Sequence, residues 1–173
     1  MERILIIGCG GAGKSTLARQ LGEKLGLPVV HLDRMFWNPG WVESAKEEFD
    51  ARIMEELEKP RWIIDGNYSR TLGMRMQKCD TVIYLDFSRM ACLWGVAKRV
   101  TTYHGKTRPD MGEGCPERLD WEFVKWIWNF NKKNRQKYYR ILNEAEGVET
   151  VILKNRRMVK RFLKSLTMEW PRR

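Results

Sequence analysis

Residues 4–15 read Ile-Leu-Ile-Ile-Gly-Cys-Gly-Gly-Ala-Gly-Lys-Ser, and this stretch decides the fold. From Gly8 onward it matches the phosphate-loop pattern G-x-x-x-x-G-K-[ST]. The apolar run before the loop is typical of a buried parallel strand. Leu17, Leu21 and Leu25 follow with a spacing of four residues, which favours an amphipathic helix. The sequence therefore predicts a strand, a glycine-rich turn and a helix N-terminus, an arrangement that binds phosphate through backbone N–H groups.

The residues of this loop have expected roles in binding a nucleotide. Its glycines lack a Cβ, so the main chain can close around phosphate groups. Lys14 is a candidate catalytic residue that would reach the β- and γ-phosphates, and Ser15 is a candidate Mg²⁺ ligand. The predicted nucleotide-binding residues of the loop are Gly8, Gly10, Gly11, Ala12, Gly13, Lys14, Ser15 and Thr16.

Length, charge and cysteine usage restrict the class of protein. A chain of 173 residues fits a single domain over 1–173. The 32 Lys and Arg against 22 Asp and Glu give a net charge of +10, which suits either nucleic acid or a polyphosphate ligand. Four cysteines without a C-x-x-C pair fit reduced thiols in a cytoplasmic protein rather than a zinc site. No apolar stretch has the length of a membrane span, so we expect no membrane partner.

Apolar runs alternate with helical patterns along the chain, which predicts an α/β fold with an open parallel sheet and helices on both faces. The expected strands are residues 3–7, 28–32, 61–64, 81–85 and 149–153. The expected helices are residues 15–25, 44–59, 70–77, 89–103, 120–145 and 156–167. The segment from Gly105 to Glu117 is rich in glycine, proline and charge, and we interpret it as a mobile excursion over about residues 104–118.

Three of the predicted strands end in aspartate, at Asp33, Asp65 and Asp86. Ligands of open α/β sheets bind beyond the carboxyl ends of the strands. We expect Asp65 to hold a metal-bound water opposite Ser15, and Asp33 to contact an acceptor as general base or as hydrogen-bonding anchor. Asp86 is expected to cap the following helix and is the third candidate. Each aspartate also has a plain alternative role as a turn or capping residue.

The guanine-specific motifs N-K-x-D and D-x-x-G and the transport-ATPase signature L-S-G-G-Q are absent, which favours a small kinase with a lid. Such enzymes place positive charge on the transferring phosphoryl group. Arg99 and Arg108, beside and within the excursion, are the candidate catalytic arginines because a guanidinium grips phosphate oxygens in pairs. The alternative is a solvated charged loop.

Four segments carry a resemblance to a known group: the phosphate loop, His31-Leu32-Asp33, Trp62–Tyr68 and Thr107–Cys115. Over nearly its whole length the chain resembles the adenylate-kinase-related proteins of the DNA topology modulation protein-like group. The resemblance implies a P-loop NTPase fold with a five-stranded parallel sheet of order 2-3-1-4-5, ATP with Mg²⁺, and a short basic lid over the phosphates. It also implies that Asn155 and Arg156 contact the base, although a basic strand-to-helix turn explains them nearly as well.

The acceptor remains open at this stage. In adenylate kinases the motif D-G-F-P-R supplies an arginine to the monophosphate acceptor, whereas residues 65–70 here read Asp-Gly-Asn-Tyr-Ser-Arg. Arg70 or Arg75 would then have to reach a phosphate. Trp37 and Trp41 are either the floor of an acceptor pocket or core residues under a short loop.

Residues 120–140 interleave aromatic and basic side chains, a composition found in proteins that bind single-stranded nucleic acid. Helical spacing favours core or lid packing instead, with one stripe at 124, 127, 128 and 131. The resemblance to similar kinases, in which arginines after the lid do so, implies that Arg135 points toward the phosphates. The sequence thus predicts an ATP-dependent kinase of a small molecule or nucleotide, as a monomer or homodimer. The alternative is an ATP-binding regulator associated with nucleic acid.

Overall fold

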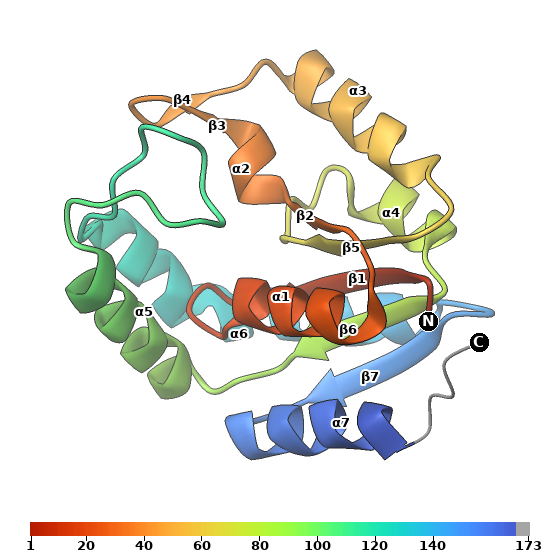
Figure 1. The fold of residues 1–173 in the computed structure, drawn as a ribbon. Helices are drawn as coiled ribbons and strands as arrows, with labels where there is room; N and C mark the ends of the chain where they lie inside the picture. Colours follow the sequence, from red (N-terminus) through yellow and green to blue (C-terminus); the bar gives the residue numbers. More distant parts are fainter. Residues whose placement is uncertain (169–173) are drawn as a thin grey trace.

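Five parallel strands form the central sheet of the computed structural model, which describes residues 1–168 (Figure 1). From one edge to the other they are β2 (Val29–His31), β5 (Trp62–Asp65), β1 (Arg3–Gly8), β6 (Thr81–Leu85) and β7 (Glu149–Leu153). Counted along the chain as the strands of this sheet, the order is 2-3-1-4-5. The predicted topology is therefore confirmed.

Helices cover both faces of the sheet, as the alternating pattern predicts. They are α1 (Lys14–Leu25), α2 (Leu32–Phe36), α3 (Lys46–Leu57), α4 (Leu72–Lys78), α5 (Arg89–Tyr103), α6 (Trp121–Asn143) and α7 (Arg156–Met168). Helices α1 and α7 contact each other in front of the sheet, and α6 runs behind it (Figure 1). Among residues 1–168, no helix is long and apolar enough to cross a membrane.

The central strands lie inside the sheet because the side chains on both of their faces are mostly apolar. Ile4, Leu5, Ile6 and Ile7 of β1 are all fully buried, and every residue of β5 and β6 is buried as well. Burying an aliphatic side chain contributes about 1.5–3 kcal/mol, so these strands anchor the core. Their carboxyl ends open into the phosphate loop and the segments that follow Asp65 and Leu85.

The structure contains a small antiparallel hairpin that the sequence did not predict. It consists of β3 (Trp37–Asn38) and β4 (Val42–Glu43), directly after α2. Residues distant in the sequence stabilise its turn: the N–H of Gly40 donates to the carbonyl of Gly114 at 2.9 Å. The indole N–H of Trp41 donates to the carbonyl of Pro116 at 3.2 Å. Two-residue strands are stabilised by such contacts and not by a local pattern.

The interpretation of residues 105–117 as mobile rather than packed is wrong. The segment is tied at its base by a bridge between His104 and Glu117 and lies beside the hairpin (Figure 1). Arg108 and Asp110 are buried within it and form an ion pair. A sequence with alternating charge looks solvated, but opposite charges that pair can be buried together. We refer to residues 104–118 as the lid segment.

Helix α6 buries one apolar stripe and exposes several large aromatic side chains. Ile127, Phe130, Tyr138 and Leu142 are buried against the sheet side. Trp128, expected in the buried stripe, is 48 % exposed. That part of the prediction is wrong because the helix faces the core with Ile127, Phe130 and Tyr138, and the side chain of Trp128 lies outside this buried side.

Candidate active site

A cavity of about 950 Å³ lies at the carboxyl ends of β1, β2 and β5. This volume is in the range of small-molecule sites. The predicted site residues that line it are Gly10, Gly11, Gly13, Lys14, Ser15, Thr16, Asp33, Asp65, Arg99, Arg108 and Arg156. The predicted residues outside its lining are Gly8, Ala12 and Asn155. Asn155 caps α7 instead, with its Oδ1 accepting the N–H of Met158 at 3.0 Å.

The phosphate loop passes so close to its neighbours that only glycine fits. A Cβ on Gly10 would lie 2.5 Å from the ring of Phe123, and one on Gly11 would lie 2.1 Å from the carbonyl oxygen of Cys92. Gly13 has φ 96° and precedes α1 without any side-chain cap. The first N–H groups of α1 therefore remain available to an anion. This cradle of backbone donors fits the phosphates of ATP.

The start of the loop is clamped to the end of β5 by Asn67. The side-chain amide of Asn67 accepts the N–H of Gly8 at 3.0 Å and donates to the carbonyl of Gly8 at 2.8 Å. The ammonium of Lys14 donates to the carbonyl of Cys9 at 3.3 Å, so this side chain folds back over the loop. Both contacts fix the loop before any ligand binds.

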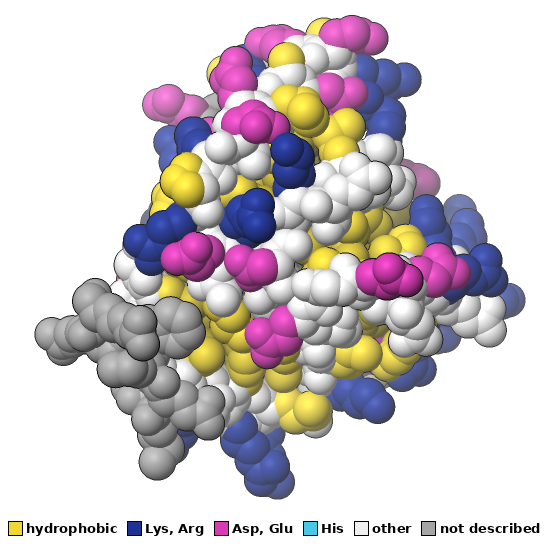
Figure 2. All heavy atoms as spheres, turned by 90° about the vertical axis from the view of Figure 1, so that its right-hand side faces the viewer, with side chains coloured by type: hydrophobic (Ala, Val, Ile, Leu, Met, Phe, Trp, Pro, Cys, Tyr) yellow, Lys and Arg dark blue, Asp and Glu magenta, His cyan; other side chains and the backbone are white. Residues whose placement is uncertain are grey.

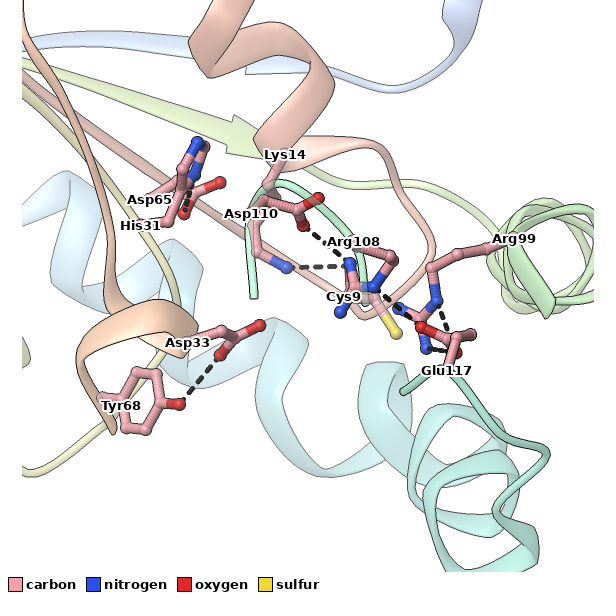
Figure 3. Close-up of polar contacts among 10 residues, drawn as sticks. All are labelled: Cys9, Lys14, His31, Asp33, Asp65, Tyr68, Arg99, Arg108, Asp110 and Glu117. Atoms are coloured by element: carbon pink, nitrogen blue, oxygen red, sulfur yellow. Dashed lines mark hydrogen bonds and ion pairs between the residues drawn. The ribbon is translucent and has the colours of Figure 1, made fainter. Parts of the chain in front are cut away.

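On the β5 side, Asp65 supplies a buried carboxylate that is only partly satisfied (Figure 3). Its Oδ1 lies 3.1 Å from Nδ1 of His31, whereas its Oδ2 is buried without a hydrogen-bond partner. Burial alone would lower the pKa of His31, but the close contact with the charged carboxylate of Asp65 outweighs it and raises that pKa above its usual value. The unsatisfied oxygen fits a metal-bound water.

The donor set suits Mg²⁺ that is bound mainly by phosphate oxygens and water. Among the residues that the structure describes, no group of three or more His, Cys, Asp or Glu side chains forms a metal cage. Mg²⁺ in phosphoryl-transfer sites is typically held by one or two protein ligands together with phosphate oxygens and water. Ser15 and Asp65, both in the cavity wall, fit that pattern.

On the β2 side, Asp33 faces the cavity and is fixed by Tyr68 (Figure 3). The phenol donates to Oδ1 of Asp33 at 2.8 Å. Burial and the charge of Asp33 raise the pKa of Tyr68, so its hydroxyl stays protonated and remains a donor. Tyr68 and Trp41 are the non-glycine residues with positive φ in the described chain, at 28° and 64°. Both line the cavity with Trp37, and strained backbone of this kind gathers at functional sites.

The lid segment brings two arginines to the cavity, joined by one carboxylate. Arg99 Nη2 lies 3.0 Å from Oε1 of Glu117, and Arg108 Nε lies 2.7 Å from its Oε2. Arg108 Nη1 also pairs with Asp110 at 2.6 Å. Figure 3 shows these four side chains together, and Lys14 lines the same cavity.

Comparison with known proteins agrees with this geometry. A family model described as an AAA domain matches residues 4–84. The shikimate kinase of Leptospira biflexa serovar Patoc is 27 % identical, over 65 % of this chain and 74 % of its own length. The structure of shikimate kinase from Bacteroides thetaiotaomicron covers 96 % of both chains with a TM-score of 0.57 and 17 % identity. The chain has the P-loop kinase fold. Shikimate kinase from Acinetobacter baumannii, solved in complex with shikimate, gives a TM-score of 0.58 at 16 % identity, over 97 % of this chain and 92 % of that one.

Within the P-loop kinase fold, two expectations about the β6 side are wrong. Asp86 does not cap α5, because the side chain of Ser88 does so by accepting the N–H of Ala91 at 3.3 Å. Asp86 instead accepts from Arg135 at 2.7 Å and from the hydroxyl of Tyr139 at 2.9 Å. Arg135 is therefore held by Asp86 and does not point toward the phosphates.

The arginines of the 65–75 region are also used elsewhere. Arg75 is fully buried and donates to the backbone carbonyls of Gly66 and Asn67 at 2.9 and 2.5 Å. Arg70 pairs with Asp50 at the surface. The expectation that Arg70 or Arg75 reaches a phosphate is wrong in this structure, because Arg75 supports the loop after β5 and Arg70 is turned away.

Asn67, Tyr68, Glu117 and Trp94 also line this cavity, and they are absent from the site residues predicted from the sequence. Trp94 is 71 % exposed and lines the cavity one residue before Gly95, which packs on the phosphate loop. Asn67 and Tyr68 stand where adenylate kinases have Phe-Pro, and this difference in sequence could have indicated that the two residues have a particular role. For Glu117 a local signal is lacking, because its partners lie 9 and 18 residues away.

Proposed function

We propose that this chain transfers the γ-phosphoryl group of ATP to a hydroxyl group of a small-molecule acceptor. The observation that carries the proposal is that the phosphate loop, Asp33 and the arginines Arg99 and Arg108 line one cavity. The similarity to shikimate kinases supports an ATP-dependent small-molecule kinase. The adenylate-kinase-like subgroup rests on the sequence resemblance alone.

The residues divide the work of in-line transfer. Tyr68 occupies Oδ1 of Asp33, so Oδ2 is the oxygen left to accept the proton of the attacking hydroxyl. As the new bond to phosphorus forms and the bond to the β-phosphate oxygen breaks, Lys14 and the two arginines stabilise the charge. Mg²⁺ would be held by Ser15 and, through water, by Asp65, and when bound it neutralises phosphate charge.

The arginines nearest the adenylate-kinase position are not free to hold an acceptor phosphate. Arg70 and Arg75, the arginines nearest the adenylate-kinase position, are engaged by Asp50 and by backbone carbonyls. Trp37 and Trp41 offer aromatic faces to a ring. Shikimate, which carries ring hydroxyls and a carboxylate and is present in one of the similar structures, is the first acceptor to test.

The test is ADP release from Mg·ATP over a panel of acceptors. The panel holds shikimate, other ring alcohols, sugars, nucleosides and nucleoside monophosphates. We expect one class of alcohol to stimulate release, and Lys14→Ala to lower that rate by about a hundredfold or more. Lys160→Ala, an exposed lysine on α7, is the matched control and should behave as wild type. A flat panel with intact Mg·ATP binding would refute the kinase proposal for these acceptors.

A second function, binding of single-stranded nucleic acid, is favoured by the surface of α6. Trp121, Trp126 and Trp128 are 73, 42 and 48 % exposed, and Arg89 lies 4.7 Å from the centre of the Trp128 ring. The face seen in Figure 2, by contrast, has acidic and basic side chains interspersed. The check is binding of an oligonucleotide at rising salt, for wild type and Trp128→Ala. A salt-independent or undetectable signal would exclude this function.

A further inference from the structure

Glu117 lies between the two candidate catalytic arginines and contacts both. Its Oε1 accepts from Nε and lies 3.0 Å from Nη2 of Arg99, which comes from α5. Its Oε2 is 2.7 Å from Nε of Arg108, in the lid segment. The Glu117 side chain is 2 % exposed and that of Arg108 is 8 % exposed. One buried carboxylate thus joins the lid segment to α5.

The contacts leave part of each guanidinium for a ligand. Nη1 of Arg99 and Nη2 of Arg108 are the nitrogens that Glu117 and Asp110 do not engage. Arg99 and Arg108 both line the cavity, and Arg99 also lies 5.3 Å from the centre of the Phe123 ring. Each arginine is therefore held on its inner edge, and Arg99 also on one face by Phe123, while a remaining N–H edge of each is left for a phosphate in the cavity.

The negative charge of Glu117 also reduces the repulsion between the two neighbouring guanidinium groups. Burial, and next the positive charge of Arg108, lower the pKa of Arg99, whereas the charge and hydrogen bond of Glu117 raise it. Without the carboxylate, two buried guanidinium groups would repel each other and turn toward solvent. A preorganised pair of arginines does not have to be assembled at the moment of transfer.

We propose that Glu117 is a positioning residue that holds Arg99 and Arg108 together for the γ-phosphate. The proposal rests on the proposed function, since it names how that phosphoryl group is gripped. The structure also offers an opposite role, in which the carboxylate occupies the place of a phosphate and must be displaced by it. The two roles predict opposite effects when the charge of Glu117 is removed.

The primary test measures binding, so it does not need the acceptor. The probes are Mg·ADP and Mg·ADP with beryllium fluoride, which mimics the γ-phosphate. We expect Glu117→Gln to weaken binding of the beryllium fluoride complex about tenfold or more, while the affinity for Mg·ADP changes less than about twofold. Glu113→Gln, an exposed glutamate of the same lid segment, is the matched control and should keep the wild-type ratio.

A double-mutant cycle separates positioning from a merely structural role. In a variant that already carries Arg108→Lys, Glu117→Gln should cost much less binding of the beryllium fluoride complex than it costs in wild type. Independent structural damage would instead give additive losses. Urea unfolding of every variant checks that the chain is folded. Should Glu117→Gln fail to fold, Glu117→Asp keeps the charge but shortens the side chain, and it should lower the same ratio by a smaller factor.

Two results would overturn the proposal: an unchanged ratio in folded Glu117→Gln, or tighter binding of the beryllium fluoride complex. Tighter binding would assign the carboxylate the displaced, inhibitory role. Failure of the proposed function would give a different result. The wild-type protein would still bind Mg·ADP with beryllium fluoride more tightly than Mg·ADP, and Glu117→Gln would still reduce this preference, but the wild-type protein would phosphorylate no acceptor.

Discussion

Gly95 offers the sharpest test of how α5 supports the phosphate loop. A Cβ at Gly95 would lie 2.0 Å from the carbonyl oxygen of Gly11. Ordinary contact begins near 3.4 Å, so Gly95→Ala forces the helix and the loop apart by about 1.4 Å. Alanine gains about 1 kcal/mol over glycine in a helix, but overpacking against backbone costs about 1–3 kcal/mol. We expect a net loss of up to about 2 kcal/mol in the free energy of unfolding.

Displacement of the loop should also weaken nucleotide binding. A shift of this size disturbs the backbone donors around Gly11, and we expect the Kd of Mg·ATP to rise about tenfold, which corresponds to about 1.4 kcal/mol. Gly73→Ala in α4 is the control, because a Cβ there meets nothing within 4 Å. That variant should be unchanged or more stable by up to about 1 kcal/mol. Urea unfolding and Mg·ATP titration of both variants are the assays. If Gly95→Ala binds and unfolds like wild type, the close packing described here is incorrect.

Three further predictions concern separate groups. Tyr68→Phe removes the hydrogen bond to Asp33 and should lower kcat about tenfold, with little change in the KM of ATP. If kcat is unchanged, orientation of Asp33 by Tyr68 does not contribute to catalysis. Asp65→Asn should raise the Mg²⁺ concentration needed for half-maximal ATP binding, and an unaltered Mg²⁺ titration would contradict its role. Burial acts to raise the pKa of Asp80, but hydrogen bonds from Thr81, Glu2 and Arg3 outweigh it and lower that pKa below its usual value. Because the folded pKa is depressed, this stabilisation is present above the unfolded value and is lost as the pH falls through the folded value. The difference in unfolding free energy between wild type and Asp80→Asn, about 1–3 kcal/mol near neutral pH, should therefore shrink in acid; a constant difference would refute it.

Elements with a strong local pattern could be predicted from the sequence. The strands of the main sheet lie within one residue of the predicted bounds, and the six predicted helices lie within two. The phosphate loop is recognisable because its glycines are required by contacts with backbone and aromatic rings, as at Gly10 and Gly11. Apolar periodicity and the glycine pattern of the phosphate loop are both properties of short stretches of sequence, so these elements can be predicted without a structure.

The parts that could not be predicted depend on contacts between distant residues. The hairpin at 37–43 is held by carbonyls of Gly114 and Pro116, more than seventy residues later. Arg135 finds Asp86 across 49 positions, which removes it from the expected phosphate site. The burial of the lid segment follows from paired charges, and the pairing of Arg108 with Glu117 cannot be read from composition alone.

The contact between the hairpin and the lid segment has a consequence for turnover. Gly112 and Gly114 allow the lid backbone to lie directly on Trp37 and Pro39, and few hydrogen bonds join the two. Since each such bond contributes about 1 kcal/mol, parting this seam costs roughly 3 kcal/mol, which corresponds to an open population on the order of one per cent. A bound molecule at the acceptor end would be sealed in during reaction and would leave only in those rare openings. Release of the product would then require the lid segment and the hairpin to part.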